Sequence, residues 1–250
     1  MAHIIYGIHP VRETLKSSHP VFEKLFVAAK EPPPALKEIL AYARQKQVPV
    51  TLTTKDELDR LTGGGFHQNI AGLIQELPYA DLEEALARSK RGETGGLFLI
   101  LDGIQDPQNF GALIRTSVGF GAHGMIIPRD RAVGITPVVM RASAGATAHL
   151  PVIRVTNIAQ TIDRLKGEGF WVYGAAGEAK DPIYELDLTG DLALVIGSEG
   201  KGIRPLVKKK CDRLFSIPMA GLISSFNASV AGGMILYEVM RQRSMKKSSV

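Results

Sequence analysis

Continuous apolar runs, each followed by a loop and then by a helical pattern, dominate the sequence from residue 96 onward. Residues 97–101 read LFLIL, which is typical of a strand buried on both faces of a parallel sheet. Further strands are predicted at 124–127, 152–155, 170–175, 192–196 and 214–217, with helices at 109–120, 136–149, 158–166, after Pro205 and at the end of the chain. This alternation predicts a doubly wound α/β domain with a mostly parallel sheet.

A smaller α/β pattern occupies residues 1–77. Predicted strands at 3–6, 22–28, 48–53 and 69–77 alternate with helices at 10–17, 34–47 and 55–61, which indicates a second sheet covered by helices. Residues 78–95 combine a proline, a charged segment and a glycine-rich stretch, and predict a linker that carries one exposed helix. We therefore place two domains at 1–77 and 96–243, followed by a flexible tail at 244–250.

Composition narrows the class of protein. A single cysteine, Cys211, excludes a disulfide within the chain and suits a reducing cytoplasm. No apolar run reaches the roughly 18 residues that a membrane span needs, and no signal-peptide pattern is present. The six histidines show no metal-ligand spacing, so we expect no metal site. The formal net charge of +5 is compatible with nucleic-acid binding, although it is weak evidence by itself.

Three loops share one design, because each follows an apolar strand and precedes a helix. They are residues 102–109 (DGIQDPQN), 197–205 (GSEGKGIRP) and 218–227 (PMAGLISSFN). Open α/β sheets bind ligands just beyond the carboxyl ends of their strands, so these loops form the predicted site. The glycines of the second loop allow close backbone approach to a ligand. They do not form a Walker A loop, because no Gly-Lys-Ser/Thr follows at the required spacing. The dinucleotide fingerprint belongs to the first strand–helix turn, which here reads DGIQDPQNFG, and a tight turn also explains the glycines.

Polar residues in the first and third loops have two interpretations. Asn109 could be an ordinary helix N-cap, with Arg115 as a solvated charge on the same helix. Alternatively, both could serve one site. Six residues span about 600° of helical rotation, so the two do not lie on one helix face and Asn109 would then have to act from the cap position. The cluster Ser224, Ser225, Asn227 and Ser229 precedes a final helix that carries Val230, Met234 and Tyr237 at i, i+4 and i+7. Capping and a functional role both stay open for this cluster.

Taken together, DPQNFGALIRT, LVIGSEGKGIRP and IPMAGLISSFNASVAGGMILYE resemble the three ordered motifs of the SpoU-type (TrmH-like) branch of the SPOUT methyltransferases. IYGIHPVRETL and FHQNIAGLI resemble the substrate-binding domain of the large-subunit rRNA guanosine 2′-O-methyltransferases, a small domain similar to ribosomal protein L30e. The resemblance implies a deep trefoil knot in the C-terminal domain, a homodimer, and methyl transfer from S-adenosylmethionine to a guanosine ribose 2′-hydroxyl in the peptidyl-transferase region of 23S rRNA.

Site residues follow from the same resemblance. The cofactor-binding positions are Gly197, Gly200, Ile217 and Phe226, and the catalytic positions are Asn109, Arg115, Glu199, Ser225 and Asn227. The family's usual Leu and Val are Phe226 and Ala228 here. Because a guanidinium loses its proton only at very high pH, Arg115 is expected to polarise the hydroxyl or hold a phosphate while another group takes the proton. Asn109, Ser225 and Asn227 would orient the ribose, and Glu199 would fix Arg115 or a loop backbone.

Rival functions remain open on the sequence. The chain could methylate tRNA, could be a catalytically inactive RNA-binding relative, or could be an α/β enzyme that modifies a small molecule. The last alternative leaves the extra domain and the basic charge unexplained.

Overall fold

The computed structural model describes residues 3–17, 22–91, 95–222 and 225–247, which belong to two compact units. The first unit comprises residues 1–78 together with 134–149, and the second comprises residues 79–133 together with 150–250. In the described part of the chain, no helix combines the length and the apolar character that crossing a bilayer requires.

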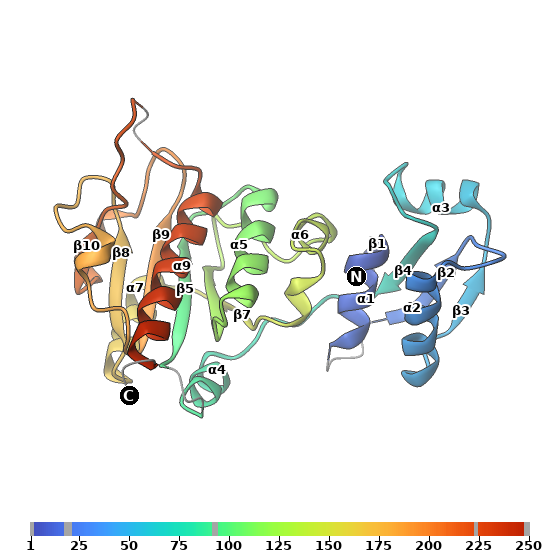
Figure 1. The fold of residues 1–250 in the computed structure, drawn as a ribbon, viewed down its shortest axis with the longest axis horizontal. Coiled ribbons are helices and arrows are strands. Elements are labelled where there is room, and N and C mark those ends of the chain that lie inside the picture. Colours follow the sequence, from blue (N-terminus) through green and yellow to red (C-terminus); the bar gives the residue numbers. More distant parts are fainter. Residues whose placement is uncertain (1–2, 18–21, 92–94, 223–224, 248–250) are drawn as a thin grey trace. The chain divides into compact units, whose positions relative to one another are not determined.

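The first unit is built on a mixed four-stranded sheet in the order β1-β4-β2-β3. Its strands are β1 (His3–Tyr6), β2 (Phe22–Val27), β3 (Val50–Leu52) and β4 (Ile70–Ile74). Its first helices are α1 (Ile8–Lys16), α2 (Pro34–Gln45) and α3 (Lys55–Thr62), visible in blue and cyan in Figure 1. The strand β4 runs antiparallel to both β1 and β2, while β2 and β3 are parallel. The predicted N-cap of α3 is confirmed, since the Thr54 hydroxyl accepts from the Glu57 N–H at 3.2 Å.

The helix predicted at 136–149 is interrupted. Helix α6 (Pro137–Ala142) is capped by Thr136 as expected, but Ala144 and Gly145 take φ values of 51° and 87°, and a 3-10 turn, η1 (Ala146–Ala148), follows. A Cβ on Gly145 would lie 2.8 Å from Glu13 Cβ on α1. The backbone of this segment therefore packs directly on α1, and two successive left-handed residues end the helix there. The prediction of one continuous helix was wrong.

The second unit contains a six-stranded sheet in the order β10-β8-β9-β5-β6-β7, and every pairing is parallel. Its strands are β5 (Leu97–Asp102), β6 (Gly124–Pro128), β7 (Val152–Val155), β8 (Trp171–Ala175), β9 (Leu192–Gly197) and β10 (Arg213–Phe215). All six residues of β5 are buried, as its apolar sequence predicts.

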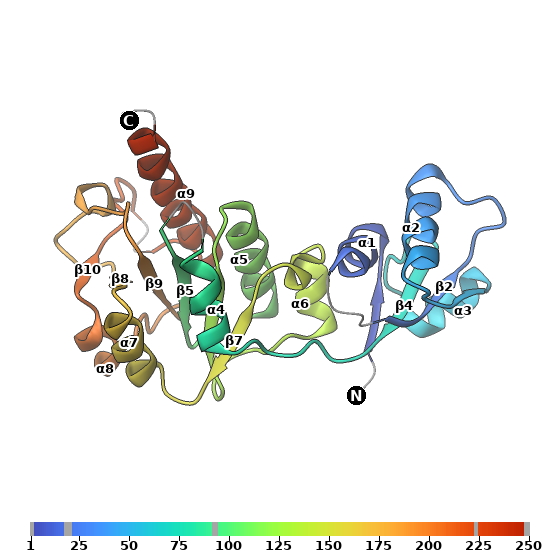
Figure 2. The ribbon, with the colours of Figure 1, turned by 90° about the horizontal axis from the view of Figure 1, so that it is seen from below.

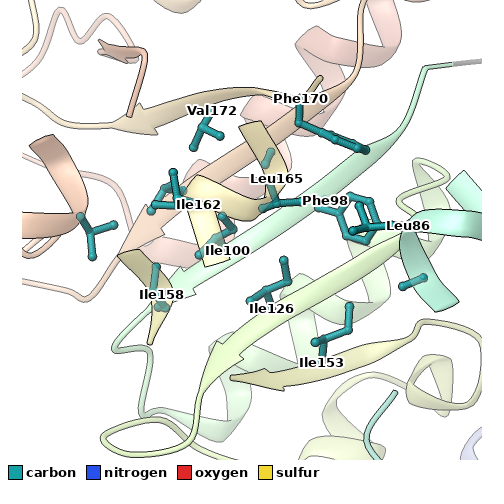
Figure 3. Packing of buried hydrophobic residues seen from close by; sticks show 14 of the residues in the cluster. Leu86, Phe98, Ile100, Ile126, Ile153, Ile158, Ile162, Leu165, Phe170 and Val172 are labelled. Carbon is teal, nitrogen blue, oxygen red and sulfur yellow. The ribbon is translucent and has the colours of Figure 1, made fainter. Parts of the chain in front are cut away.

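Helices cover both faces of this sheet, as Figures 1 and 2 show. The helices are α4 (Leu82–Ser89), α5 (Pro107–Gly119), α7 (Ile158–Gly167), α8 (Pro205–Lys210) and α9 (Ala228–Lys247), with a 3-10 turn η2 (Ile183–Glu185) before β9. Helices α4, α7 and α8 contribute to one core with Phe98, Ile100 and Ile126, and Figure 3 shows these three side chains. Helices α5 and α9 pack side by side on the other face.

Helix α4 is not the exposed helix that the composition predicts. Leu86 and Ala85 are 2% and 1% exposed, and they join the core that includes Phe98. Its charged residues Glu83, Glu84 and Arg88 accompany buried positions spaced three and four residues apart, so the helix is amphipathic. It belongs to the compact second unit.

Helix α9 presents the predicted apolar stripe to solvent instead of to the core. Val230, Met234 and Tyr237 are 47%, 40% and 60% exposed, whereas Ile235, Leu236 and Val239 are buried. The reason is a close contact with α5, where a Cβ on Gly232 would lie 2.2 Å from Leu113 Cδ2. Gly232 fixes which face of α9 meets α5, and the stripe stays about half exposed in the single chain.

Candidate active site

A cavity of about 480 Å³ opens where β8, β9 and β10 end, and the residues that line it include Ala175, Gly197 and Phe215 from these three ends. Its volume lies within the roughly 300–1,000 Å³ that is typical of small-molecule sites. All four predicted cofactor-binding residues line it, as do two of the predicted catalytic residues: Gly197, Gly200, Ile217, Phe226, Glu199 and Ser225. The loops that follow β9 and β10 thus converge on one cavity at the carboxyl edge of the sheet.

The loop after β9 is a tight backbone hairpin. Ser198 and Gly202 exchange two backbone hydrogen bonds, with N···O distances of 3.2 and 2.8 Å. A Cβ on Gly197 would lie 2.1 Å from the carbonyl carbon of Gly202, so only glycine fits. Gly200, at φ 80°, completes the turn. This packing leaves the backbone of the loop lining the cavity.

An ion pair with a buried carboxylate and a half-exposed guanidinium holds the other end of this loop. The Asp102 side chain, at the end of β5, is fully buried and accepts from the backbone N–H, the Nε and the Nη2 of Arg204, each at 2.7 Å. Neither residue is among the predicted site residues. An acidic residue that ends an apolar strand was the available signal, but its partner lies 102 positions away.

Two asparagines and a glutamate form a hydrogen-bonded group beside the cavity. Glu199 Oε1 accepts from Asn109 Nδ2 at 2.9 Å and from Asn227 Nδ2 at 2.7 Å, and Asn227 Nδ2 also donates to Asn109 Oδ1 at 2.8 Å. The Ala228 N–H contributes a longer contact to Glu199 at 3.4 Å. The three loops that the sequence singles out therefore meet through their polar side chains.

The helix caps clarify the two interpretations of these residues. Asp106 is the N-cap of α5 and accepts from the Asn109 N–H at 2.8 Å, so the expectation that Asn109 occupies the cap was wrong. Asp before Pro at the start of a helix was the missed signal. Asn227 does cap α9, because its Oδ1 accepts from the backbone N–H groups of Ser229 and Val230 at 2.9 and 3.3 Å. Its amide nitrogen serves the site while its oxygen serves the helix.

Comparison with known proteins decides the family. The family described as "SpoU rRNA Methylase family" matches residues 96–237, and "RNA 2′-O ribose methyltransferase substrate binding" matches residues 4–80. The chain belongs to the SpoU rRNA methylase family. It is 45% identical to the 23S rRNA (guanosine-2′-O-)-methyltransferase RlmB of Coxiella burnetii, over 96% of this chain and 95% of that protein.

Two further relatives agree with this assignment to the SpoU family. The putative TrmH family tRNA/rRNA methyltransferase YacO of Bacillus subtilis is 40% identical over 96% of this chain and 95% of its own. The crystal structure of the SpoU methyltransferase AviRb from Streptomyces viridochromogenes, in complex with the cofactor AdoMet, superposes with a TM-score of 0.81. The two sequences are 26% identical, and the match covers 98% of this chain and 91% of the AviRb chain. The predicted α/β fold with a mostly parallel C-terminal sheet is confirmed.

Arg115 stands apart from the other predicted residues of this SpoU chain. It lies on α5, six residues after Asn109, and its side chain is exposed. Within the described residues it makes no hydrogen bond or ion pair, so Glu199 does not fix it. Ser225 lines the cavity and is exposed, while Ser224 lies outside the described residues.

Charge at the cavity rim comes from a lysine–glutamate pair. Lys208 on α8 donates to Glu178, and this contact holds the pKa of the Glu178 carboxyl below its usual value. Both residues line the cavity of this SpoU domain. In the described part of the chain, no cluster of three or more His, Cys, Asp or Glu side chains is arranged to hold a metal ion.

Proposed function

We propose that this chain transfers the methyl group of S-adenosylmethionine to the ribose 2′-hydroxyl of a guanosine in 23S rRNA. The observation that carries the proposal is the convergence of the three family loops: a cavity at the sheet edge is lined by Gly197 and Phe226, and Asn109 and Asn227 are joined through Glu199 beside it. The substrate is supported by the 45% identity to a 23S rRNA (guanosine-2′-O-)-methyltransferase over nearly the full length of both chains.

The cavity fits S-adenosylmethionine. Apolar side chains, among them Ile196, Phe215 and Ile217, provide a dry surface for a purine, and the glycine-lined hairpin presents backbone groups for its polar edge. Gly197, Gly200, Ile217 and Phe226 would hold the cofactor. When bound, it supplies a methyl group activated by a positively charged sulfur.

The chain's own residues position the nucleophile. By hydrogen-bond count, Asn227 is fully used, because its oxygen caps α9 and its two amide hydrogens go to Asn109 and Glu199. Asn109 keeps one amide hydrogen and one lone pair that no described residue takes. Asn109 is therefore the member of the group that orients a ribose hydroxyl, and Asn227 is a positioning residue. Alignment of this kind supplies much of the rate gain in a transfer reaction.

Arg115 is assigned to the RNA. A permanently charged, exposed guanidinium with no partner among the described residues suits a phosphate or a polarised hydroxyl of the substrate. It would draw the hydroxyl proton toward a phosphate or a water molecule without losing its own. Ser225, at the exposed edge of the cavity, would complete the ribose contacts.

Domain roles and assembly follow from the same proposal. Residues 1–77 would bind the RNA, residues 96–243 would carry out the chemistry in a knotted domain, and the enzyme would act in the cytoplasm, where ribosomal RNA is made and modified. The exposed stripe of Val230, Met234 and Tyr237 on α9 is the surface that a second copy of the chain would cover. The trefoil knot and the homodimer stay predictions.

The deciding experiment maps 2′-O-methyl marks across rRNA and tRNA in a strain that lacks this protein. Loss of one guanosine mark in 23S rRNA, restored by the wild-type gene but not by an Arg115→Ala gene, is the expected result. Loss of a tRNA mark would assign the chain to the tRNA substrates that the name of the Bacillus relative includes. Unchanged marks, together with no calorimetric binding of S-adenosylmethionine, would identify an inactive RNA-binding relative.

A further inference from the structure

The loop between α3 and β4 holds an aromatic side chain out in solvent. Phe66 is 85% exposed, more than any other large apolar side chain described in the first unit. A phenyl ring left in water forgoes the stabilisation of about 1.5–3 kcal/mol that burial provides. The position is explained if the ring is buried against a ligand.

The backbone on either side of Phe66 is fixed. Gly65 packs directly on Tyr6, since a Cβ there would lie 2.1 Å from the Tyr6 hydroxyl oxygen. His67, only 9% exposed, accepts from the Asn69 N–H through Nδ1 at 3.0 Å. Its Nε2 then carries the proton and donates to Asp59 Oδ1 at 3.2 Å. The ring of Phe66 is displayed from a loop that is anchored on both sides.

Backbone strain follows Phe66 and is itself anchored. Gln68 and Asn69 are consecutive non-glycine residues with φ values of 51° and 62°, a left-handed conformation that costs free energy. The Gln68 Oε1 accepts from the Ile8 N–H at 3.1 Å, which satisfies an N–H at the start of α1. The Asn69 carbonyl accepts from the Ala28 N–H at 3.0 Å. Such strain persists only where surrounding contacts determine it, and it concentrates at ligand sites.

A positively charged side chain, Arg141, lies near the loop that displays Phe66. The guanidinium carbon of Arg141 on α6 lies 4.4 Å above the centre of the Tyr6 ring, the same side chain against which Gly65 packs. Tyr6 contacts both the guanidinium of Arg141 and the backbone of Gly65, so a positive charge lies near the loop that displays Phe66. An aromatic platform beside a guanidinium is the combination that binds unpaired bases and their phosphates.

We propose that Phe66 stacks on an unpaired nucleobase of the RNA substrate and so positions it on the first unit. The inference rests on the proposed function, because it takes RNA as the ligand, and it adds the residue and the mode of contact. The segment that holds Phe66 matches the family described as "RNA 2′-O ribose methyltransferase substrate binding". An unpaired base is specified because bases inside an A-form helix are already stacked and are not open to an aromatic side chain.

The test measures RNA affinity of the full chain and of Phe66→Ala. The probes are a transcript of the 23S rRNA peptidyl-transferase region and a fully paired RNA duplex of equal length. Phe66→Ala is expected to weaken binding to the transcript by roughly 5- to 150-fold and to leave the duplex nearly unaffected. Phe66→Trp restores affinity, whereas Phe66→Leu, which is apolar but has no ring, does not. The dependence of affinity on salt stays unchanged, because stacking releases no counterions.

Leu52→Ala is the matched control, since Leu52 is 76% exposed in the same unit, and it leaves both affinities unchanged. Equal melting temperatures of wild type and Phe66→Ala exclude a folding effect.

An unchanged affinity of Phe66→Ala for the transcript overturns the inference. A change in oligomeric state also overturns it, because Phe66 would then be a protein contact. If the wild-type protein methylates rRNA but Phe66→Ala binds the transcript as tightly as wild type does, only the stacking role is refuted. Wild-type protein that methylates no RNA refutes the proposed function instead.

Discussion

At the amino ends of β5 and β9 in the second unit, polar side chains form hydrogen bonds with backbone groups. Arg243 on α9 donates to the carbonyls of Gly95 at 2.7 Å, Gly96 at 3.1 Å and Gly190 at 2.7 Å. Its partners are carbonyl groups that precede the two strands, and burial lowers the pKa of its guanidinium. His123 likewise accepts from the Leu97 N–H through Nδ1 at 3.1 Å.

At the carboxyl ends of the same strands, polar side chains mainly hold one another. Asp102 binds Arg204, and Glu199 gathers Asn109 and Asn227. The backbone there is left lining a cavity. The difference shows that the two ends of this parallel sheet have different roles. Side chains at the amino end stabilise the fold by hydrogen-bonding to backbone groups, whereas the carboxyl end keeps backbone donors and acceptors available for ligands. Substitutions at the two ends should therefore separate activity from stability.

The largest expected effect is on turnover, at an arginine of the helix that follows the carboxyl end of β5. Arg115→Ala should lower kcat about 10²–10³-fold, the loss typical when one transition-state donor is removed, with no change in melting temperature because the side chain is exposed. Single-turnover methylation at saturating RNA and S-adenosylmethionine measures this. Arg88→Ala, an exposed arginine on α4 paired with Glu84, is the control and keeps full activity. Near-normal turnover of Arg115→Ala would remove the residue from the mechanism. Full rescue by Arg115→Lys would show that charge alone matters.

The amino end should respond in the opposite way. Arg243→Ala should lower the free energy of unfolding by about 2–3 kcal/mol, because the charge-assisted hydrogen bonds to the carbonyls of Gly95, Gly96 and Gly190 are lost. Urea unfolding followed by the fluorescence of Trp171, the chain's single tryptophan, reports on this unit. Activity per folded molecule should be unchanged. Arg241→Ala is the matched control, since its guanidinium is 41% exposed and an ion pair at the surface contributes at most about 1 kcal/mol. A loss of kcat in folded Arg243→Ala would contradict the division between the two ends.

Gly197 tests whether backbone packing at the carboxyl end serves the cofactor. Gly197→Ala forces the Gly202 backbone aside, and overpacking of this kind should raise the Kd for S-adenosylmethionine by about tenfold or more. Calorimetric titration of each variant measures the Kd. Gly190→Ala has open space at its Cβ and lies outside the cavity lining, so it should bind normally. Equal affinities of the two variants would separate the hairpin from cofactor binding.

The sequence predicts the elements well where local pattern decides them. The run 97–101 is apolar because β5 is buried on both faces, and Thr54 and Thr136 cap helices through contacts three residues away. It fails where distant packing decides. Gly145 ends a helix because of α1, more than 100 residues earlier in the chain. Gly232 turns α9 through its contact with Leu113.

The site shows the same limit. The three loops are visible in the sequence as strand–loop–helix junctions, but the residue roles came from the family resemblance. The partners of Glu199 lie 90 and 28 positions away, so no local pattern shows that it holds Asn109 and Asn227 instead of Arg115. The Asp102–Arg204 pair is hidden for the same reason.

The smallest expected effect is on the pH dependence of stability, and it comes from His123 at the amino end of the sheet. Burial lowers its pKa from 6.5, and the positive charge of Arg243 lowers it further against the opposing effect of Asp191. Between the lowered folded value and 6.5, the unfolded chain binds a proton that the folded chain does not, so stability falls as pH falls through that window. His123→Asn keeps an acceptor for the Leu97 N–H and removes the titration. Urea unfolding at pH 8 and pH 5.5 should show a smaller loss for His123→Asn than for wild type, and the difference should shrink in an Arg243→Ala background. Equal losses in wild type and His123→Asn would show that this histidine does not couple the amino end to pH.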